Sequence, residues 1–232
     1  MCGRYVSPDR AAIERAWQIG RATSNPFRQR YNVLPTTLVP VLRAAPGGGL
    51  ALDEARWGLV PAWWKEAKPP QATFNARSED AAGKPIWREP YRRARCLLPA
   101  VGWYEWQAVE SVDEATGEIR RFRQPYFIYP ADRRLACFAG LLSARGAPGG
   151  AEQLSCALLT RAAAGRAAEI HDRMPVVLPE AAFGRWLAPE VVRPEDVAAL
   201  IAAARADFEH YPVSTRLNAA KTDDAALIDP LP

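Results

Sequence analysis

The stretch RCLLPAVGWYEWQAV, residues 95–109, decides the fold class of this 232-residue chain. It contains two runs rich in apolar and aromatic residues, Cys96–Val101 and Trp103–Val109, and each run is typical of a β-strand. Further strand-like runs follow at Arg120–Ile128, Leu135–Leu142 and Gln153–Thr160, with turns expected at Thr116-Gly117 and Asp132-Arg133. The middle of the chain therefore predicts a series of strands joined by short turns.

The segments on either side of these strands predict helices as well as strands. A short strand is expected at Cys2–Val6, and a hairpin at Thr37–Arg43 and Leu50–Val60. The first helix is predicted to begin at Pro8 and to end at Gly20, with Ala12, Ile13, Ala16 and Trp17 on one face. Further helices are predicted at Arg77–Ala82, Pro85–Arg92, Pro179–Leu187 and Pro194–Ala204. Strands and helices do not alternate, and no linker divides the chain. We therefore expect an α+β fold around antiparallel sheet, in one domain spanning residues 1–232.

Composition excludes several classes. Hydrophobic residues make up 49% and charged residues 24% of the chain, as in ordinary globular proteins. The longest apolar run, Val197 to Ala204, is far shorter than the roughly 18 residues that cross a bilayer, and the N-terminus lacks a signal-peptide core. We expect a cytoplasmic protein. The net charge of +4 includes 26 arginines, which fit phosphate contacts but also fit a coding bias.

The cysteines differ in what they predict. Cys96, Cys137 and Cys156 lie in apolar runs and are expected to be small buried hydrophobes. The chain has no C-x-x-C pair and only two histidines, so neither a metal site nor a cofactor is expected. Cys2 is different, because loss of Met1 would leave an amine and a thiol on adjacent carbons, with pKa values of roughly 8 and 8.5. Such a group attacks a carbonyl twice and closes a thiazolidine, or transfers an acyl group; otherwise Cys2 is accidental.

Two residues are candidates for proton transfer. His171, in EIHDRMP (residues 169–175), is either an acid–base group or a hydrogen-bonded loop histidine. Glu105 shares one strand face with Trp103 and Gln107. Aromatic neighbours would remove water from this carboxylate and raise its pKa. The alternative is a solvated glutamate on an edge strand.

Two further motifs fit substrate binding. Asn75, in NARSE (residues 75–79), is either a helix cap or an amide that orients a substrate. Trp63 and Trp64 follow a proline in a loop, where two adjacent aromatic residues cannot easily both be core. Exposed, they would stack on nucleic-acid bases or wedge between them.

Taken together, these segments resemble one family closely, the SOS response-associated peptidase (SRAP) family of abasic-site-processing proteins. The resemblance covers nearly the whole chain. It rests on six ordered motifs, which are MCGRY (1–5), RYNVLP (30–35), WGLVP with the adjoining tryptophans (57–64), NARSE (75–79), GWYEW (102–106) and HDRMP (171–175).

This resemblance implies a barrel-like antiparallel core with short flanking helices and a basic groove for single-stranded DNA containing abasic sites. Cys2 would condense with the ring-opened aldehyde of an abasic site and form a thiazolidine crosslink after removal of Met1. Glu105 would manage the protons of imine formation, His171 would assist ring opening, and Asn75 would hold the amine or the sugar. The expected DNA contacts are Arg4, Trp63, Trp64, Arg77 and Arg173.

The resemblance also implies autopeptidase (hydrolase) and lyase activities, a monomer, and nucleoid association when the protein is bound to DNA. Asp80 stands where a threonine is common, Gln107 replaces a frequent lysine, and His210 lies in a departing segment and receives no role. Two alternatives stay open. One is an N-terminal-nucleophile amidohydrolase acting on an amide such as glutamine, and the other is a non-catalytic single-stranded DNA-binding module.

Overall fold

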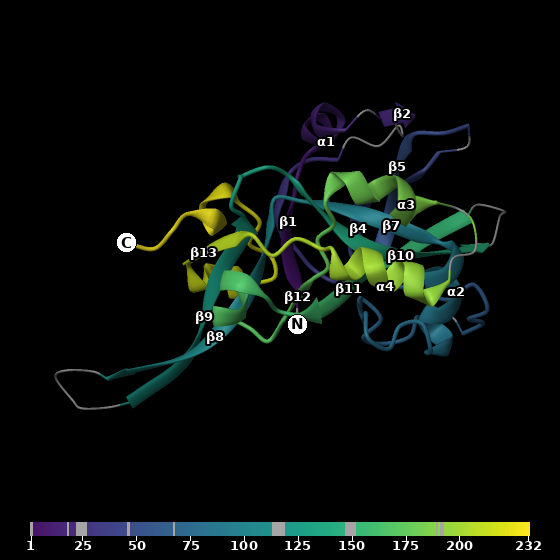
Figure 1. Ribbon diagram of the computed structural model, residues 1–232. Coiled ribbons are helices and arrows are strands. Elements are labelled where there is room, and N and C mark those ends of the chain that lie inside the picture. Colours follow the sequence, from purple (N-terminus) through teal and green to yellow (C-terminus); the bar gives the residue numbers. More distant parts are fainter. Residues whose placement is uncertain are drawn as a thin grey trace.

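The computed structural model describes residues 2–17, 19–21, 27–45, 47–66, 68–112, 119–146, 152–188, 190 and 193–232 (Figure 1). The strands are β1 (Arg4–Ser7), β2 (Ile19–Arg21), β3 (Arg30–Val33), β4 (Leu38–Ala44), β5 (Leu50–Trp57), β6 (Asn75–Arg77), β7 (Arg95–Ala100), β8 (Gly102–Val112), β9 (Ile119–Pro130), β10 (Ala136–Gly146), β11 (Glu152–Ala162), β12 (Arg173–Pro175) and β13 (Phe208–Pro212). The helices are α1 (Arg10–Ala16), α2 (Pro85–Arg93), α3 (Phe183–Leu187) and α4 (Pro194–Ala202), with 3₁₀ turns η1 (Gly165–Glu169), η2 (Glu180–Ala182), η3 (Thr215–Asn218) and η4 (Ala225–Ile228).

A five-stranded barrel forms the centre of the fold. Antiparallel pairs join β5 to β4, β4 to β7, β7 to β10 and β10 to β11. The ring is closed where β11 meets β5 in parallel, with Cys156 opposite Trp57. The predicted α+β fold with a barrel-like core is confirmed, although this closing contact is parallel and not antiparallel.

A second sheet packs beside the barrel, in the order β13-β9-β8-β1-β3. Its two longest strands, β8 and β9, stay paired from Trp103 and Ile128 out to Val112 and Ile119. Since β1 pairs only with Gly102–Tyr104 and β13 only with Tyr126–Pro130, the outer part of β8 and β9 is a two-stranded arm that extends beyond the sheet (Figure 1).

Alternation along the strands separates the barrel interior from its outer surface. On β10, Phe138 and Leu142 belong to the interior cluster, whereas Cys137 and Leu141 pack outward among helical residues such as Trp186. The interior cluster continues to Cys2, Tyr5 and Trp103, so the second sheet closes over the barrel on the side of the N-terminus. All four cysteines are buried, as predicted for Cys96, Cys137 and Cys156.

One predicted helix is absent, and another is shorter than predicted. Residues 78–83 form turns and no helix, because Ser78 N still donates to Thr160 O beside β6 and leaves only one turn before α2 begins. The first helix ends at Ala16, before Gly20, since Trp17 takes an extended conformation and packs on Phe183. Ile13 and Trp17 are buried, but Ala16 is exposed. The Thr116-Gly117 turn lies outside the described residues.

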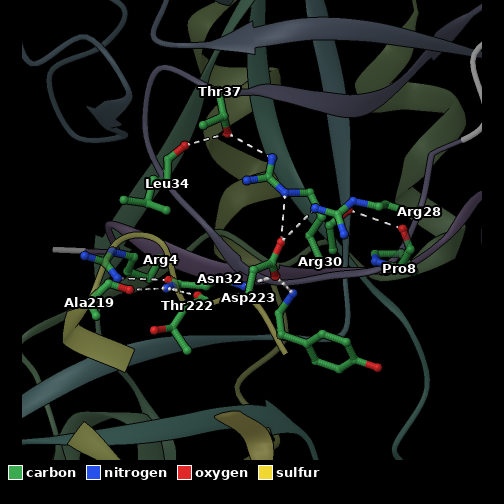
Figure 2. Close-up of polar contacts among 12 residues, drawn as sticks. Arg4, Pro8, Arg28, Arg30, Asn32, Leu34, Thr37, Ala219, Thr222 and Asp223 are labelled. Carbon is green, nitrogen blue, oxygen red and sulfur yellow. Dashed lines mark hydrogen bonds and ion pairs between the residues drawn. The ribbon is translucent and has the colours of Figure 1, made fainter. Parts of the chain in front are cut away.

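The C-terminal segment is fastened to the second sheet by one polar network (Figure 2). Asp223 Oδ1 accepts from the backbone N–H groups of Tyr31 (2.6 Å) and Asn32 (3.1 Å), and its Oδ2 lies 3.5 Å from the Arg30 guanidinium. The Asn32 side chain, itself buried, donates to Thr222 O over 2.7 Å. These contacts give RYNVLP a structural role, because it anchors a segment 191 residues away in sequence. Within the described part of the chain, no helix is long and apolar enough to cross a membrane.

Candidate active site

Cys2 lies two residues before β1, and its side chain is fully buried. Its Sγ is 3.9 Å from Arg4 O, and its own carbonyl accepts a 2.7 Å hydrogen bond from the Asn75 side-chain amide. Burial raises the pKa of the Cys2 thiol well above its ordinary value, and the nearby Glu105 carboxylate raises it further. The thiol is therefore neutral near pH 7. Met1 lies outside the described residues.

Asn75 is the first residue of β6, which pairs in parallel with β11 so that Asn75 lies opposite Leu158. Its side chain caps no helix and instead donates to Cys2, which excludes the capping alternative. Within the described residues, Asn75 Oδ1 is buried and has no hydrogen-bond partner. Asn75 therefore presents an acceptor close to Cys2.

Glu105 reaches the same place from β8. Tyr104 pairs with Arg4, so one further step along β8 brings Glu105 opposite the residues that precede β1. At the start of β8, Gly102 allows close contact with β9, because a Cβ atom there would lie 2.4 Å from Ile128 O. Glu105 is only 2% exposed, which excludes the solvated alternative. Burial raises its pKa to about 7, the range in which one carboxyl group both gives and takes protons.

His171 follows η1 and lies just before β12. Its Nε2 is 3.9 Å from Glu105 Oε2, and its side chain is 19% exposed. Burial lowers the pKa of His171, so the ring is neutral near pH 7. The Arg173 backbone N–H donates to Nδ1 over 2.9 Å, which assigns the ring proton to Nε2. Asp172 Oδ1 is also 2.7 Å from Nδ1, but that carboxylate is 85% exposed.

The segment before His171 is held by Gln107 and His210, for which the sequence motifs predict no role. Gln107 Nε2 donates to Glu169 O over 2.9 Å, and His210 Nε2 lies 3.0 Å from Glu169 Oε2. His210 comes from β13 and Gln107 from β8, so two strands clamp the end of η1. No sequence motif could place these residues together, because Glu169 is 62 positions from Gln107 and 41 from His210.

The three arginines predicted to contact DNA differ in how many hydrogen bonds and ion pairs they already make within the protein. Arg77 is exposed, two residues beyond Asn75 on β6. Arg4 Nη1 donates to Asn32 Oδ1 (2.9 Å) and to Leu217 O (2.7 Å) (Figure 2). Arg173 makes a bidentate ion pair with Glu79, at 2.6 and 2.9 Å, and also donates to Thr160 O. A phosphate contact from Arg173 would have to compete with Glu79.

The paired tryptophans occupy the loop after β5. Trp63 is 58% exposed, and its ring centroid is 5.9 Å from that of Trp64 at an angle of 55°. Trp64 is half-buried, and its indole Nε1 donates to Lys68 O over 3.0 Å. Trp64 therefore supports the ring of Trp63 at the surface. The tryptophans at positions 17, 57, 87 and 186 are, by contrast, buried.

The residues near Cys2 favour acid–base and nucleophilic chemistry. Across the described ranges, no group of three or more His, Cys, Asp or Glu side chains is arranged to hold a metal ion. What the geometry brings together is a thiol, a carboxyl group that titrates near pH 7, a neutral imidazole and an amide.

Comparison with known proteins identifies the family to which this chain belongs. The model of the SOS response associated peptidase (SRAP) family matches residues 1–220. The chain belongs to the SRAP family. Among SRAP relatives, the abasic site processing protein YoqW of Bacillus subtilis (strain 168) is 31% identical over 232 residues, covering 99% of each chain.

Two further matches support the SRAP assignment. The abasic site processing protein YedK of Escherichia coli (strain K12) is 33% identical over 204 residues, which cover 87% of this chain and 85% of YedK. A crystal structure of a protein from Bacteroides thetaiotaomicron superposes with a TM-score of 0.77 over the whole of both chains, at 19% identity. That structure bears on the fold alone.

Proposed function

We propose that this SRAP protein processes abasic sites in single-stranded DNA by forming a covalent crosslink through Cys2 after removal of Met1. The observation that carries the proposal is the position of Glu105. A carboxyl group whose pKa is about 7 lies buried beside a cysteine at the start of the chain. The abasic site processing proteins among its relatives align over most of the chain and make an abasic site the substrate to test first.

The order of bond formation follows from the protonation states. Burial keeps the Cys2 thiol protonated, so the freed α-amine, with an ordinary pKa of roughly 8, is the first nucleophile. Its nitrogen attacks the aldehyde carbon of the ring-opened sugar and gives a carbinolamine. Loss of the carbinolamine hydroxyl as water leaves an iminium. The sulfur then adds to the same carbon and closes the thiazolidine, so one water is released overall.

Glu105 serves both proton transfers. Its protonated form gives a proton to the departing hydroxyl, and the resulting carboxylate then takes the proton from the thiol as sulfur adds. The carboxyl group thus ends in the state in which it began. A pKa of about 7 suits both steps, because the two forms are then equally populated at neutral pH.

His171 and Asn75 prepare the substrate and the nucleophile. With its proton on Nε2, which faces Glu105, His171 donates to the sugar ring oxygen as the ring opens. Asn75 holds the Cys2 carbonyl through its amide nitrogen, and its oxygen is available to accept from the freed amine. The amine is thereby aimed with its lone pair away from Asn75.

The DNA strand would lie across exposed basic and aromatic side chains around this site. Arg77 and Arg4 would contact phosphates, Arg173 would do so in competition with Glu79, and Trp63 supported by Trp64 would stack on a base.

We further infer that residues 1–232 act as one monomeric domain, since β13 and the segment beyond it complete the sheet that contains β1. Lyase activity belongs to the same proposal, because an imine at Cys2 is a step toward strand cleavage. Autopeptidase activity belongs to it because Met1 has to be removed to free the Cys2 amine.

One experiment separates this function from its alternatives. The purified protein is incubated with single-stranded DNA that contains one abasic site, and separately with glutamine. A heat-stable protein–DNA crosslink is the expected result. Release of ammonia from glutamine without crosslinking would instead indicate an amidohydrolase, and binding that heat fully reverses would indicate a non-catalytic module. Either outcome would overturn the proposal.

A further inference from the structure

A hollow opens beside Glu105 at the base of the β8–β9 arm. Its volume is about 500 Å³, and its lining consists of Glu105, Trp106, Phe122, Arg123, Thr215 and Asn218. These residues come from both strands of the arm and from η3. Because Glu105 forms part of its wall, a molecule in the hollow would lie next to the substrate carbon in the proposed reaction.

Aromatic rings provide the apolar part of this hollow. Phe122 is 42% exposed, and it lies opposite Val109 where β9 pairs with β8. Trp106 is fixed in orientation, because its indole Nε1 donates to Asn218 Oδ1 over 2.9 Å. Flat, partly exposed aromatic surfaces stack on nucleic-acid bases with little dependence on sequence.

Arg123 provides the positive charge. Its Nη2 donates to Trp106 O over 3.5 Å, so the guanidinium lies across β8 toward the hollow. Burial lowers the pKa of His171, and the Arg123 charge contributes to that lowering. Burial raises the pKa of Glu105, whereas the Arg123 charge opposes part of that rise. Arg123 therefore lies within electrostatic reach of both groups.

Arg121, the neighbouring arginine on the arm, does not line the hollow. Arg121 is paired with Glu110 over 2.7 Å on the adjacent strand, and its side chain is 79% exposed. It faces the same side of β9 two residues further from the site. Arg121 thus supplies a matched control for a charge on the arm that is outside the hollow.

We propose that this hollow is a subsite for the nucleotide next to the abasic site, with its base stacked on Phe122 and its phosphate paired with Arg123. The inference rests on the proposed function and makes it more specific. Thr215 and Asn218, both exposed at the rim, add a hydroxyl and an amide that suit the polar edges of a nucleotide. The abasic nucleotide itself has no base, so a base held beside it fixes the register of the strand.

The test measures reversible binding in a Cys2→Ala background, where no crosslink forms. Three oligonucleotides are compared, with the abasic nucleotide internal, at the 5′ end, or at the 3′ end. Phe122→Ala and Phe122→Leu should each weaken binding to the internal site about tenfold. Arg123→Gln should weaken it by a similar factor and reduce the salt slope by about 0.7. Ile119→Ala and Arg121→Gln are the controls, and thermal unfolding verifies that each variant is folded.

The terminal sites give the decisive contrast. On the one oligonucleotide that lacks the occupying neighbour, the Phe122 and Arg123 variants should bind as tightly as the unsubstituted background. Equal losses on all three oligonucleotides, or losses no greater than those of the controls, would overturn the subsite. Crosslinking by the unsubstituted protein is measured separately. Its absence would reject the Cys2 chemistry, while the binding contrast would still decide the subsite.

Discussion

The Nε2 atom of His171 lies 3.9 Å from the Oε2 atom of Glu105; the glutamate comes from β8 and the histidine from the segment between η1 and β12. Their pKa values move in opposite directions for one cause. Burial raises that of the carboxyl group to about 7 and lowers that of the imidazole. Near neutral pH the pair is therefore close to losing or gaining a single proton, which suits a reaction that moves protons at both sides of one carbon.

Glu105→Gln should slow crosslinking on every abasic substrate, because the amide has the shape of the carboxyl group but neither gives nor takes the proton. The Glu105 contribution to the rate of the unsubstituted protein should fall as pH increases through about 7, because the reaction begins with the carboxyl group protonated. In the variant, only the rise due to the amine, at roughly pH 8, should remain. Crosslinking rates between pH 5.5 and 9 check this. An unchanged pH profile in Glu105→Gln would remove Glu105 from the reaction.

The same substitution predicts a change in stability with a defined sign. The folded-state pKa of Glu105 is raised from 4.5, so its favourable contribution is complete below pH 4.5 and is lost as pH rises through about 7. Relative to Glu105→Gln, the unsubstituted protein should therefore lose unfolding free energy on the order of 3 kcal/mol between pH 4.5 and 8. Urea denaturation of both proteins at the two pH values measures the difference. A gain with rising pH would contradict the burial argument.

His171→Ala should slow crosslinking most when the abasic sugar starts in its closed form. A simple aldehyde needs no ring opening and should be less affected. The measurement is the rate of the variant on an abasic site and on a pre-opened aldehyde analogue. Equal slowing of both substrates would show that His171 does not act on the ring oxygen.

His210 is expected to position His171 through Glu169. Its imidazole holds the Glu169 carboxylate 3.0 Å away, and Gln107 holds the Glu169 carbonyl. His210→Ala should loosen this segment, let water reach His171, and move its lowered pKa back up toward 6.5. Because the chain has only two histidines, an NMR titration of the variant follows His171 alone. An unchanged His171 pKa would show that the contact between His210 and Glu169 does not position His171.

DNA binding should separate stacking from charge. Trp63→Ala should weaken binding to single-stranded DNA by roughly 1–3 kcal/mol and leave the salt slope nearly unchanged. Arg77→Gln should reduce that slope by about 0.7. Arg173→Gln should reduce it less, because Glu79 already occupies that guanidinium. Anisotropy titrations from 50 to 200 mM salt test all three. Tighter binding to intact duplex than to single strands would reject this interface.

The sequence predicted what local pattern and motif determine. The alternation around Glu105 placed it on the same strand face as Trp103, and its neighbours indicated the burial that the structure has. The strands in the middle of the chain, β7 to β11, were predicted correctly because each is either a run in which apolar residues alternate with others or a continuous buried stretch.

What the sequence could not predict depends on long-range contacts. The parallel closure between β5 and β11 joins residues almost a hundred positions apart. The contacts of Glu169 with Gln107 and His210 depend on three elements meeting at one point. The ion pair of Arg173 with Glu79 likewise shows that an arginine in a shared motif can serve the fold. None of these contacts leaves a periodic signal in the chain.

The most direct test of the account is the mass of the N-terminal peptide after reaction with an abasic oligonucleotide. The protein is digested with protease, the DNA with nuclease, and the linked fragment is sequenced by mass spectrometry. We predict a peptide that begins at Cys2, lacks Met1, and carries the sugar with the loss of one water. A peptide that retains Met1, or a stable crosslink at any other residue, would contradict the central claim.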